Sequence, residues 1–319
     1  MSALLSAMGS VGLLVAMAVP GYALQKARKL PDTFAGGAAN VIVYVGVPMV
    51  TLFSFAQKSF DVVLLFNMGM VAVLSAVLML MAFGVSVLVL GRGQLTPASR
   101  ARVAAGCMSN CSFMGIPVMQ ALFPGDVEPV IYAVVFGVMF NIFSWTLLVY
   151  ILTGEKKYMR VSRVLINPPT LILLLALPVF FCDLGQVIPV PVLDAVGTIG
   201  AMTTPLSMLV LGIRLADIPL KVLLGSPKAY LTSLVKLLLV PGMTLGVVYG
   251  LSFVLPAAHG MVASSMVIIM GMPAAFSVVM FAKMYDADTG EAAKNVLLSA
   301  LLSIVTIPLL SAVVNGLAM

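Results

Sequence analysis

Long apolar stretches, separated by short charged or Pro- and Gly-rich segments, fill the chain from end to end. A helix needs about 20 apolar residues to cross the hydrocarbon core of a bilayer. Ten stretches approach or exceed that length, and we number them spans 1 to 10. They cover residues 4–24, 34–56, 62–90, 103–123, 130–152, 169–182, 194–215, 229–254, 261–282 and 294–316. The stretches lack the alternation of a membrane β-barrel, so they predict an all-α polytopic membrane protein with ten transmembrane helices.

The composition supports the same class. Hydrophobic residues make up 62% of the 319 residues and charged residues only 9%. A water-soluble domain has too little polar surface to cover that much apolar material, so the lipid bilayer is the expected solvent. The first apolar stretch lacks a basic leader and a small-residue cleavage site, and we therefore interpret it as the first span rather than a signal peptide.

The basic residues predict the orientation in the membrane. The net charge is +6, but 15 of the 17 Lys and Arg residues lie after odd-numbered spans. Loops rich in Lys and Arg stay in the cytoplasm, so both termini are expected outside. This distribution favours a membrane topology signal over a nucleic-acid partner. The 15 residues are Lys26, Arg28, Lys29, Arg92, Arg100, Arg102, Lys156, Lys157, Arg160, Arg163, Arg214, Lys221, Lys228, Lys283 and Lys294.

Motifs for enzymatic chemistry are missing from the sequence. It contains no Walker loop, no H-E-x-x-H, no G-x-S-x-G and no pair of acidic residues inside a span. We therefore expect neither an enzyme nor a bound cofactor. Cys107, Cys111 and Cys182 have no paired spacing and are interpreted as small core residues. His259, the single histidine, is interpreted as an interfacial side chain of an outer loop, because one histidine cannot build a metal site.

Prolines inside the apolar stretches reveal an internal repeat. Pro48 in span 2 and Pro117 in span 4 are followed, 157 and 156 residues later, by Pro205 in span 7 and Pro273 in span 9. The nearly constant shift predicts two copies of a five-helix unit. Because five is an odd number, the second copy enters the membrane from the opposite face, and the repeats are inverted as in many secondary transporters.

The repeat also divides the chain. The first five-helix repeat covers 1–152 and the second 169–319, and the basic segment 153–168 forms a cytoplasmic linker between them.

Two Gly-x-Pro sequences lie at equivalent positions of the two repeats, Gly115–Pro117 in span 4 and Gly271–Pro273 around Met272 in span 9. Proline removes a helical N–H and glycine permits a non-helical backbone, while a broken helix persists in a membrane only where protein or a water-filled cavity satisfies its backbone. We therefore expect broken helices 4 and 9 to cross near the midplane and to offer free N–H groups to an anion. The alternative is a simple kink at each proline.

Polar side chains near these breaks are candidates for ligand contact. Ser109 and Asn110 precede the first break, and Asn141 interrupts the apolar run of span 5. An amide in lipid needs a partner, which is a ligand or a neighbouring helix. Serines around the second break are weaker candidates: Ser264, Ser265 and Ser277.

Lys236 is the one charge well inside an apolar stretch, about 12 Å along span 8 at 1.5 Å per residue. Its ammonium either snorkels to the cytoplasmic interface or supplies positive charge near the crossing, through a water-filled cavity or by capping half-helix carbonyls. The spans contain no deep Asp or Glu as an obvious proton carrier, and sodium can bind to backbone and Ser, Thr or Asn oxygens. Energy coupling therefore stays open between uniport, proton coupling and sodium symport.

Several motifs resemble one known family. The segments "SNCSFMGIPVMQALFPGD", "NPPTLILLLALP", "TTPLSMLVLGIRL", "VKLLLVP" and "MPAAFSVVMFAKMYDAD" follow one another in the family's order. The chain resembles the auxin efflux carriers, within the larger bile acid and auxin transporter group. Plant members carry a long insert between the repeats, whereas the linker here has about 16 residues, so the resemblance favours the short bacterial-type branch of the cell inner membrane.

The resemblance implies an elevator-type secondary active transporter of small organic anions, from indole carboxylates to malonate and malate. It implies scaffold helices 1, 2, 6 and 7, transport-domain helices 3–5 and 8–10, and a homodimer formed through the scaffold helices. Asn110 and Asn141 match the asparagines that meet the substrate carboxylate in the family. One alternative is a sodium-coupled symporter of the bile acid type. Another is a channel or a membrane sensor subunit, but the spans show no continuous polar stripe for a channel and the chain has no added soluble domain for a sensor.

Overall fold

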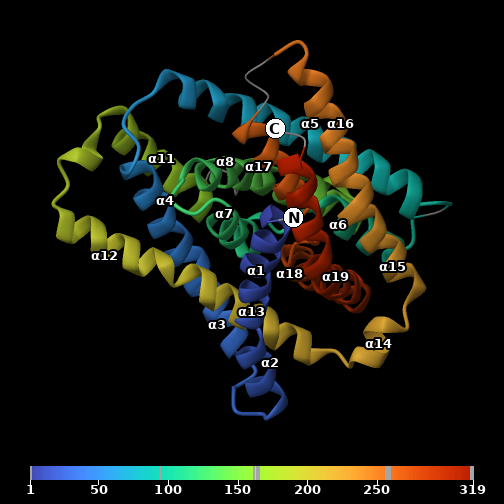
Figure 1. Cartoon of the computed structure of the whole chain (residues 1–319). Coiled ribbons are helices and arrows are strands. Elements are labelled where there is room, and N and C mark those ends of the chain that lie inside the picture. Colours follow the sequence, from blue (N-terminus) through green and yellow to red (C-terminus); the bar gives the residue numbers. More distant parts are fainter. Residues whose placement is uncertain (1, 94, 161, 163–165, 256–259, 317–319) are drawn as a thin grey trace.

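The computed structural model describes residues 2–93, 95–160, 162, 166–255 and 260–316. This part of the chain is mostly helical and contains no β-strand, which confirms the predicted all-α class (Figure 1). Arg163 and His259, which entered the sequence analysis, lie outside the described residues.

The helices follow the predicted spans closely. In chain order they are α1 (Ser2–Ala16), α2 (Val19–Lys26), α3 (Phe34–Val41), α4 (Val47–Ala56), α5 (Val62–Leu90), α6 (Pro97–Cys107), α7 (Ile116–Leu122), α8 (Glu128–Phe143), α9 (Val149–Thr153), α11 (Pro168–Phe181), α12 (Val190–Ala201), α13 (Thr203–Asp217), α14 (Leu220–Leu224), α15 (Pro227–Leu234), α16 (Val240–Ser252), α17 (Met261–Met270), α18 (Ser277–Met284) and α19 (Thr289–Gly316). Short π-helical turns join some of them: η1 (Ile42–Gly46), η2 (Cys111–Gly115), η3 (Ser144–Leu148) and η6 (Val235–Leu239).

Six helical segments of the described part are long and apolar enough to cross a membrane. They correspond to predicted spans 2, 3, 5, 7, 8 and 10. Three shorter apolar helices, Cys111–Leu122, Pro168–Phe181 and Met261–Met270, belong to spans 4, 6 and 9, and span 1 is divided into α1 and α2. The structure is therefore that of a polytopic membrane protein, and the number of crossings stays a prediction.

Helix starts are set by side chains that accept the first free N–H groups. The Asp61 carboxylate accepts from Val63 N at 2.9 Å at the start of α5, and the Thr96 hydroxyl accepts from Ser99 N at 3.3 Å at the start of α6. Both are favoured residues for this position. Pro97 follows at the first turn of α6, where its missing N–H costs nothing.

Prolines inside the apolar segments coincide with the π-helical turns. A proline ring clashes with the carbonyl one turn earlier, and a wider turn relieves that clash without ending the helix. Three of the four π-helical turns are followed by a proline at the second residue of the next helix: Pro48 after η1, Pro117 after η2 and Pro241 after η6.

Helices of predicted spans 1 and 7 pack with their backbones in contact. A Cβ on Gly212 of α13 would lie 1.9 Å from Ala18 O, and a Cβ on Gly21 of α2 would lie 2.2 Å from Leu209 O. Only glycine permits this approach. In the same part of the molecule α4 packs against α11 and α12.

The remaining helices pack mainly with one another. The long helix α5 contacts α6 and α8, α16 contacts α17, and α19 contacts α6, α15 and α18. The N-terminal helix α1 lies alongside α19 and joins the two sets of helices (Figure 1).

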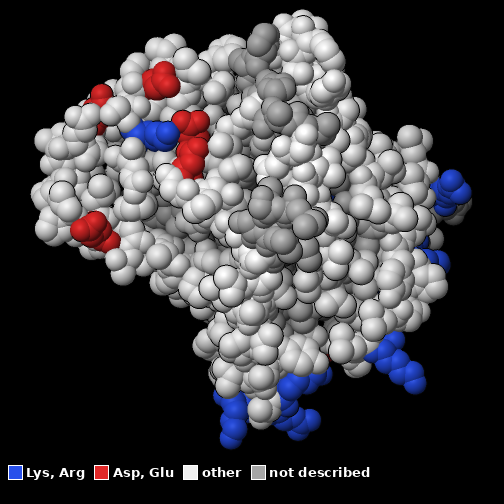
Figure 2. Space-filling model, in the orientation of Figure 1, with Lys and Arg blue, Asp and Glu red and all other residues white. Residues whose placement is uncertain are grey.

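Most basic and most acidic side chains lie at different ends of the face seen in Figure 2. Lys and Arg lie at the end that holds the C-terminus of α2 and at the side of α14 and the α5–α6 turn. Asp and Glu gather at the other end, near α11 and α12. Lys58, which is on the predicted outer side, forms an ion pair there with Glu128 at 2.7 Å.

The three cysteines are free thiols. Cys107 and Cys111 are buried, as expected for small core residues, but Cys182 is exposed at the end of α11. The core interpretation is therefore wrong for Cys182, which follows the last residue of α11, Phe181.

Candidate functional site

The first break interrupts predicted span 4 between α6 and η2. The helix ends at Cys107, and Met108 and Asn110 have non-helical backbones with ψ values of 115° and 69°. Ser109 and Asn110 are nearly inaccessible, at 1% and 4% exposure. The break is thus an unwound, buried segment of three residues, Met108 to Asn110. It contains Ser109 and Asn110, which were expected from the sequence to precede the break.

This position differs from the predicted one. Gly115 is the last residue of η2 and Pro117 the second residue of α7, and both lie in an unbroken helical run. The Gly115 N–H bonds to Asn110 O at 2.9 Å, a five-residue spacing. The π-helical turn therefore absorbs the proline, and the helix opens several residues earlier.

The second break lies where the sequence predicted it. Helix α17 ends at Met270, Gly271 occupies the next position, and helical structure resumes at Ser277 with α18. A Cβ on Gly271 would lie 2.2 Å from Leu310 Cδ2. Met272 is completely buried, and Pro273 has no N–H to continue the helix.

The two unwound segments pair with each other. The Asn110 N–H donates to Pro273 O at 2.9 Å, and the Ala275 N–H donates to Met108 O at 3.0 Å. These bonds place Ser109 opposite Ala274 in an isolated antiparallel bridge. Each break therefore satisfies backbone groups of the other, as a low-dielectric interior requires.

Helix α19 contributes one further bond to this crossing. The Ala274 N–H donates to Ser299 Oγ at 3.0 Å, while that hydroxyl donates to Val296 O at 2.8 Å. Ser299 is completely buried. It thereby holds the second unwound segment against the last helix.

Lys236 reaches the crossing from η6. Its ammonium donates to Ser109 Oγ at 2.6 Å and to Met270 O at 2.8 Å, and its side chain is completely buried. Met270 O belongs to the last turn of α17, where a cation interacts favourably with the helix dipole. Of the two alternatives left open by the sequence, snorkelling to the interface is wrong, because the ammonium caps a half-helix carbonyl instead.

No carboxylate of the described residues lies within ion-pair distance of Lys236. An ammonium has three N–H donors, and two of these have protein partners. A protonated Lys236 would therefore be a positive charge without a counter-charge among the described residues.

The other predicted site residues differ in what they contact. Gly115 faces it, since a Cβ there would lie 3.9 Å from Met272 Cγ. The Asn141 amide instead donates to Asn167, at the start of α11, which is the helix-to-helix bond considered as its alternative role. Ser264 is buried, and the buried Ser265 and Ser277 hydroxyls have no hydrogen-bond partner among the described residues.

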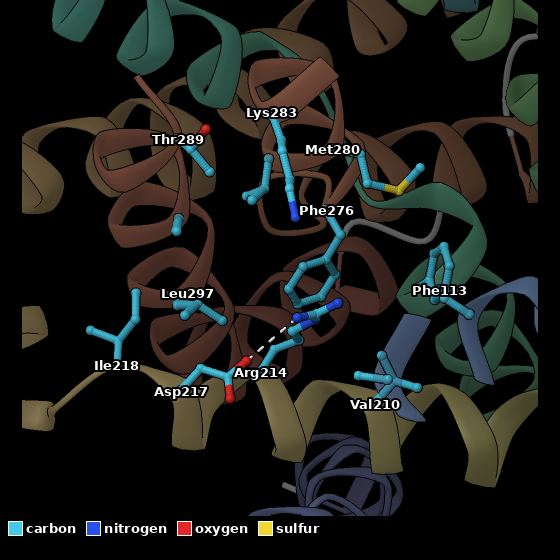
Figure 3. A pocket seen from close by; sticks show the side chains of 14 residues that line it. Phe113, Val210, Arg214, Asp217, Ile218, Phe276, Met280, Lys283, Thr289 and Leu297 are labelled. Atoms are coloured by element: carbon cyan, nitrogen blue, oxygen red, sulfur yellow. Dashed lines mark hydrogen bonds and ion pairs between the residues drawn. The ribbon is translucent and has the colours of Figure 1, made fainter. Parts of the chain in front are cut away.

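A cavity of about 320 Å³ lies next to the two breaks (Figure 3). Its walls come from α3 and α13 on one side and from α18 and α19 on the other, with Phe113 and Phe276 next to the two breaks. Arg214 and Lys283 both line it. The sequence analysis used these two residues only for topology, and nothing in their spacing pointed to a shared cavity.

Comparison of the sequence with protein-family profiles identifies a family of membrane transport proteins. A profile of the family described as membrane transport protein matches residues 6–164 and 156–311. A comparison with curated proteins finds no match. The profile supports the resemblance to the auxin efflux carriers, and it covers nearly the whole chain. The chain belongs to the membrane transport protein family.

Proposed function

We propose that the protein is a secondary active transporter that moves a small organic anion, a mono- or dicarboxylate, across the bacterial inner membrane. The observation that carries this proposal is the position of the Lys236 ammonium, which is completely buried between the two paired breaks. A buried charge without a counter-charge is costly. A carboxylate that binds next to it supplies the missing negative charge.

The N-termini of the helical segments at the crossing also favour a carboxylate. Two helical segments, η2 with α7 and then α18, begin at the crossing, and the N-terminus of a helix has free N–H groups and a partial positive charge. Asn110 lies at the start of the first of these segments. In this proposal its amide and the nearby backbone N–H groups bind the carboxylate, and Asn141 would join them from α8 only if its bond to Asn167 opened.

The packing supports an elevator mechanism. Helices of spans 1, 2, 6 and 7 would form the scaffold, and those of spans 3–5 and 8–10 would form the moving domain. The Thr204 hydroxyl of α13 donates to Gln120 Oε1 of α7 at 2.9 Å, so a polar bond between the two parts would break and reform during transport. The cavity next to α13 then corresponds to an inward-open state, with the basic loops in the cytoplasm and both termini outside.

Vesicle transport tests this proposal. Purified protein in liposomes should take up radiolabelled malonate, malate or an indole carboxylate with saturation, and unlabelled substrate inside should accelerate uptake by counterflow. A carrier shows both properties, whereas a channel or a sensor subunit shows neither. The same assay with sodium, proton or potential gradients separates a sodium symporter of the bile acid type from proton coupling and uniport. A homodimer through the scaffold helices is the assembly that we expect in the bilayer.

A further inference from the structure

Two cationic side chains line the cavity from opposite walls. Arg214 belongs to the last turn of α13, and Lys283 belongs to α18. In Figure 3 the Arg214 guanidinium and the Lys283 ammonium both point into the cavity, one from each side. Lys283 has no ion-pair partner in the described part of the chain. The cavity therefore brings together two cations from distant parts of the sequence.

One carboxylate holds Arg214 in place. Asp217 Oδ2 lies 3.5 Å from Arg214 Nη1, and the other oxygen of Asp217 accepts from Gln25 Nε2 at 3.0 Å. Asp217 is thus fixed from two sides and orients the guanidinium, which retains further N–H donors for a ligand. Two cations and one carboxylate leave the lining with one positive charge.

The rest of the cavity is mostly apolar. Apart from Thr289, every lining residue without a charge is hydrophobic. Phe113 and Phe276 contribute aromatic rings to the lining. A second negative charge would have to lie against these apolar side chains, which is unfavourable. One anionic group attached to an apolar body matches this lining.

We propose that Arg214 and Lys283 form a second anion site, separate from the crossing, that binds the carboxylate of a monocarboxylate while its apolar body packs against Phe113 and Phe276. The site rests on the proposed transport function. Neither Ser109, Asn110 nor Lys236 lines the cavity, so the proposed site is separate from the crossing. Phe113 and Phe276 line the cavity and follow the two unwound segments in the chain.

The position of the two cations gives the site a second role. Arg214 would belong to the scaffold and Lys283 to the moving domain, so an empty cavity places like charges on opposite sides of the boundary. Asp217 offsets part of the Arg214 charge, and the repulsion that remains grows as water leaves the cavity. A bound carboxylate removes this repulsion, and closure of the cavity is therefore easier with the ligand than without it.

Calorimetric titration of the full-length protein in detergent tests the site. The probes are phenylacetate, the uncharged and similarly shaped phenylacetamide, and malonate. We expect phenylacetate to bind more tightly than both other probes. Arg214→Gln and Lys283→Gln should each weaken phenylacetate binding by about 1.5- to fivefold, the range for partly exposed charge pairs, and leave phenylacetamide binding unchanged. Lys221→Gln is the matched control, because Lys221 is an exposed basic residue of α14 that does not line the cavity.

Vesicle uptake separates this inference from the proposed function. In liposomes, Arg214→Gln and Lys283→Gln should raise the half-saturating phenylacetate concentration by the same factor, with a smaller change in the maximal rate. Wild-type affinity and half-saturation in both variants would overturn the second site while saturable uptake still supported the transporter. Absence of saturable uptake by the wild type, combined with cation-dependent phenylacetate binding, would instead contradict the transport function and leave the anion site standing.

Discussion

Lys236 Nζ donates a hydrogen bond of 2.6 Å to Ser109 Oγ, and this bond joins the second predicted repeat to the unwound segment of the first. The same ammonium caps the end of α17 through Met270 O. One side chain therefore holds both breaks, and the geometry of the crossing depends on it.

Replacing Lys236 with Met should abolish or strongly reduce anion transport. The protein should still fold, because removing a buried charge also removes its desolvation penalty, which offsets the two lost hydrogen bonds. Lys236→Arg retains the charge and should keep part of the activity. Uptake in liposomes together with thermal unfolding in detergent checks the prediction, with the exposed Lys228→Gln as the control. Normal transport by the Met variant would show that the charge has no role.

Ser299→Ala should destabilise the second break. The variant leaves the buried Ala274 N–H without its acceptor, at a cost of about 1–3 kcal/mol. We expect a lower melting temperature and weaker transport. Ser303→Ala is a matched control one turn along α19. Like that of Ser299, the Ser303 hydroxyl donates within its own helix, and its other contact is Met114 Sδ at 3.9 Å, so it accepts no backbone N–H of the second break in the described residues. Equal effects of the two substitutions would contradict a specific role for Ser299 at the crossing.

Gly212→Ala should force α2 and α13 apart. A methyl group there would lie 1.9 Å from Ala18 O, and such overpacking costs about 1–3 kcal/mol. Gly246 lies in α16, and a Cβ at that position would meet no atom within 4 Å. Gly246→Ala should therefore be neutral or slightly stabilising. Thermal unfolding of both variants measures the difference, and a stable Gly212→Ala protein would rule out the close backbone contact.

Single cysteines in a cysteine-free protein report the orientation. Val187 is 74% exposed near the end with acidic residues, and Lys221 is exposed in α14 near the basic end. We expect an impermeant thiol reagent to label Val187→Cys in intact cells and to label Lys221→Cys only after the membrane is opened. The reverse pattern would invert the proposed topology.

Much of the fold could be predicted from the apolar pattern alone. The bounds 34–56 and 62–90 coincide with helical segments of the structure, because each run ends at polar residues that cap or terminate a helix. The break at Gly271–Pro273 was also predictable, since both residues oppose a helix. The first break was predicted at Gly115–Pro117, whereas the helix opens at Met108–Asn110. A proline alone does not show whether a helix opens or widens into a π-helical turn.

The site was less accessible to sequence analysis. Ser109, Asn110 and Lys236 were predicted as candidates, but the bond between Lys236 and Ser109 spans 127 positions and has no local signature. Ser299 carries no signal at all, since serine is common at helix interfaces. Arg214 and Lys283 fit the charge rule for cytoplasmic loops. They lie far apart in the sequence, so their positions gave no sign that both line one cavity.

Counterflow by the wild type and by Asn110→Ala tests the central proposal most directly. Liposomes loaded with unlabelled substrate should accumulate labelled substrate through the wild-type protein, with saturation. Asn110→Ala should raise the half-saturating concentration roughly ten- to a hundredfold, the cost of about 1.5–3 kcal/mol for a lost hydrogen bond to a charged group. Flux without saturation or counterflow, or wild-type half-saturation in the variant, would contradict a carrier that binds its anion at the crossing of the two broken helices.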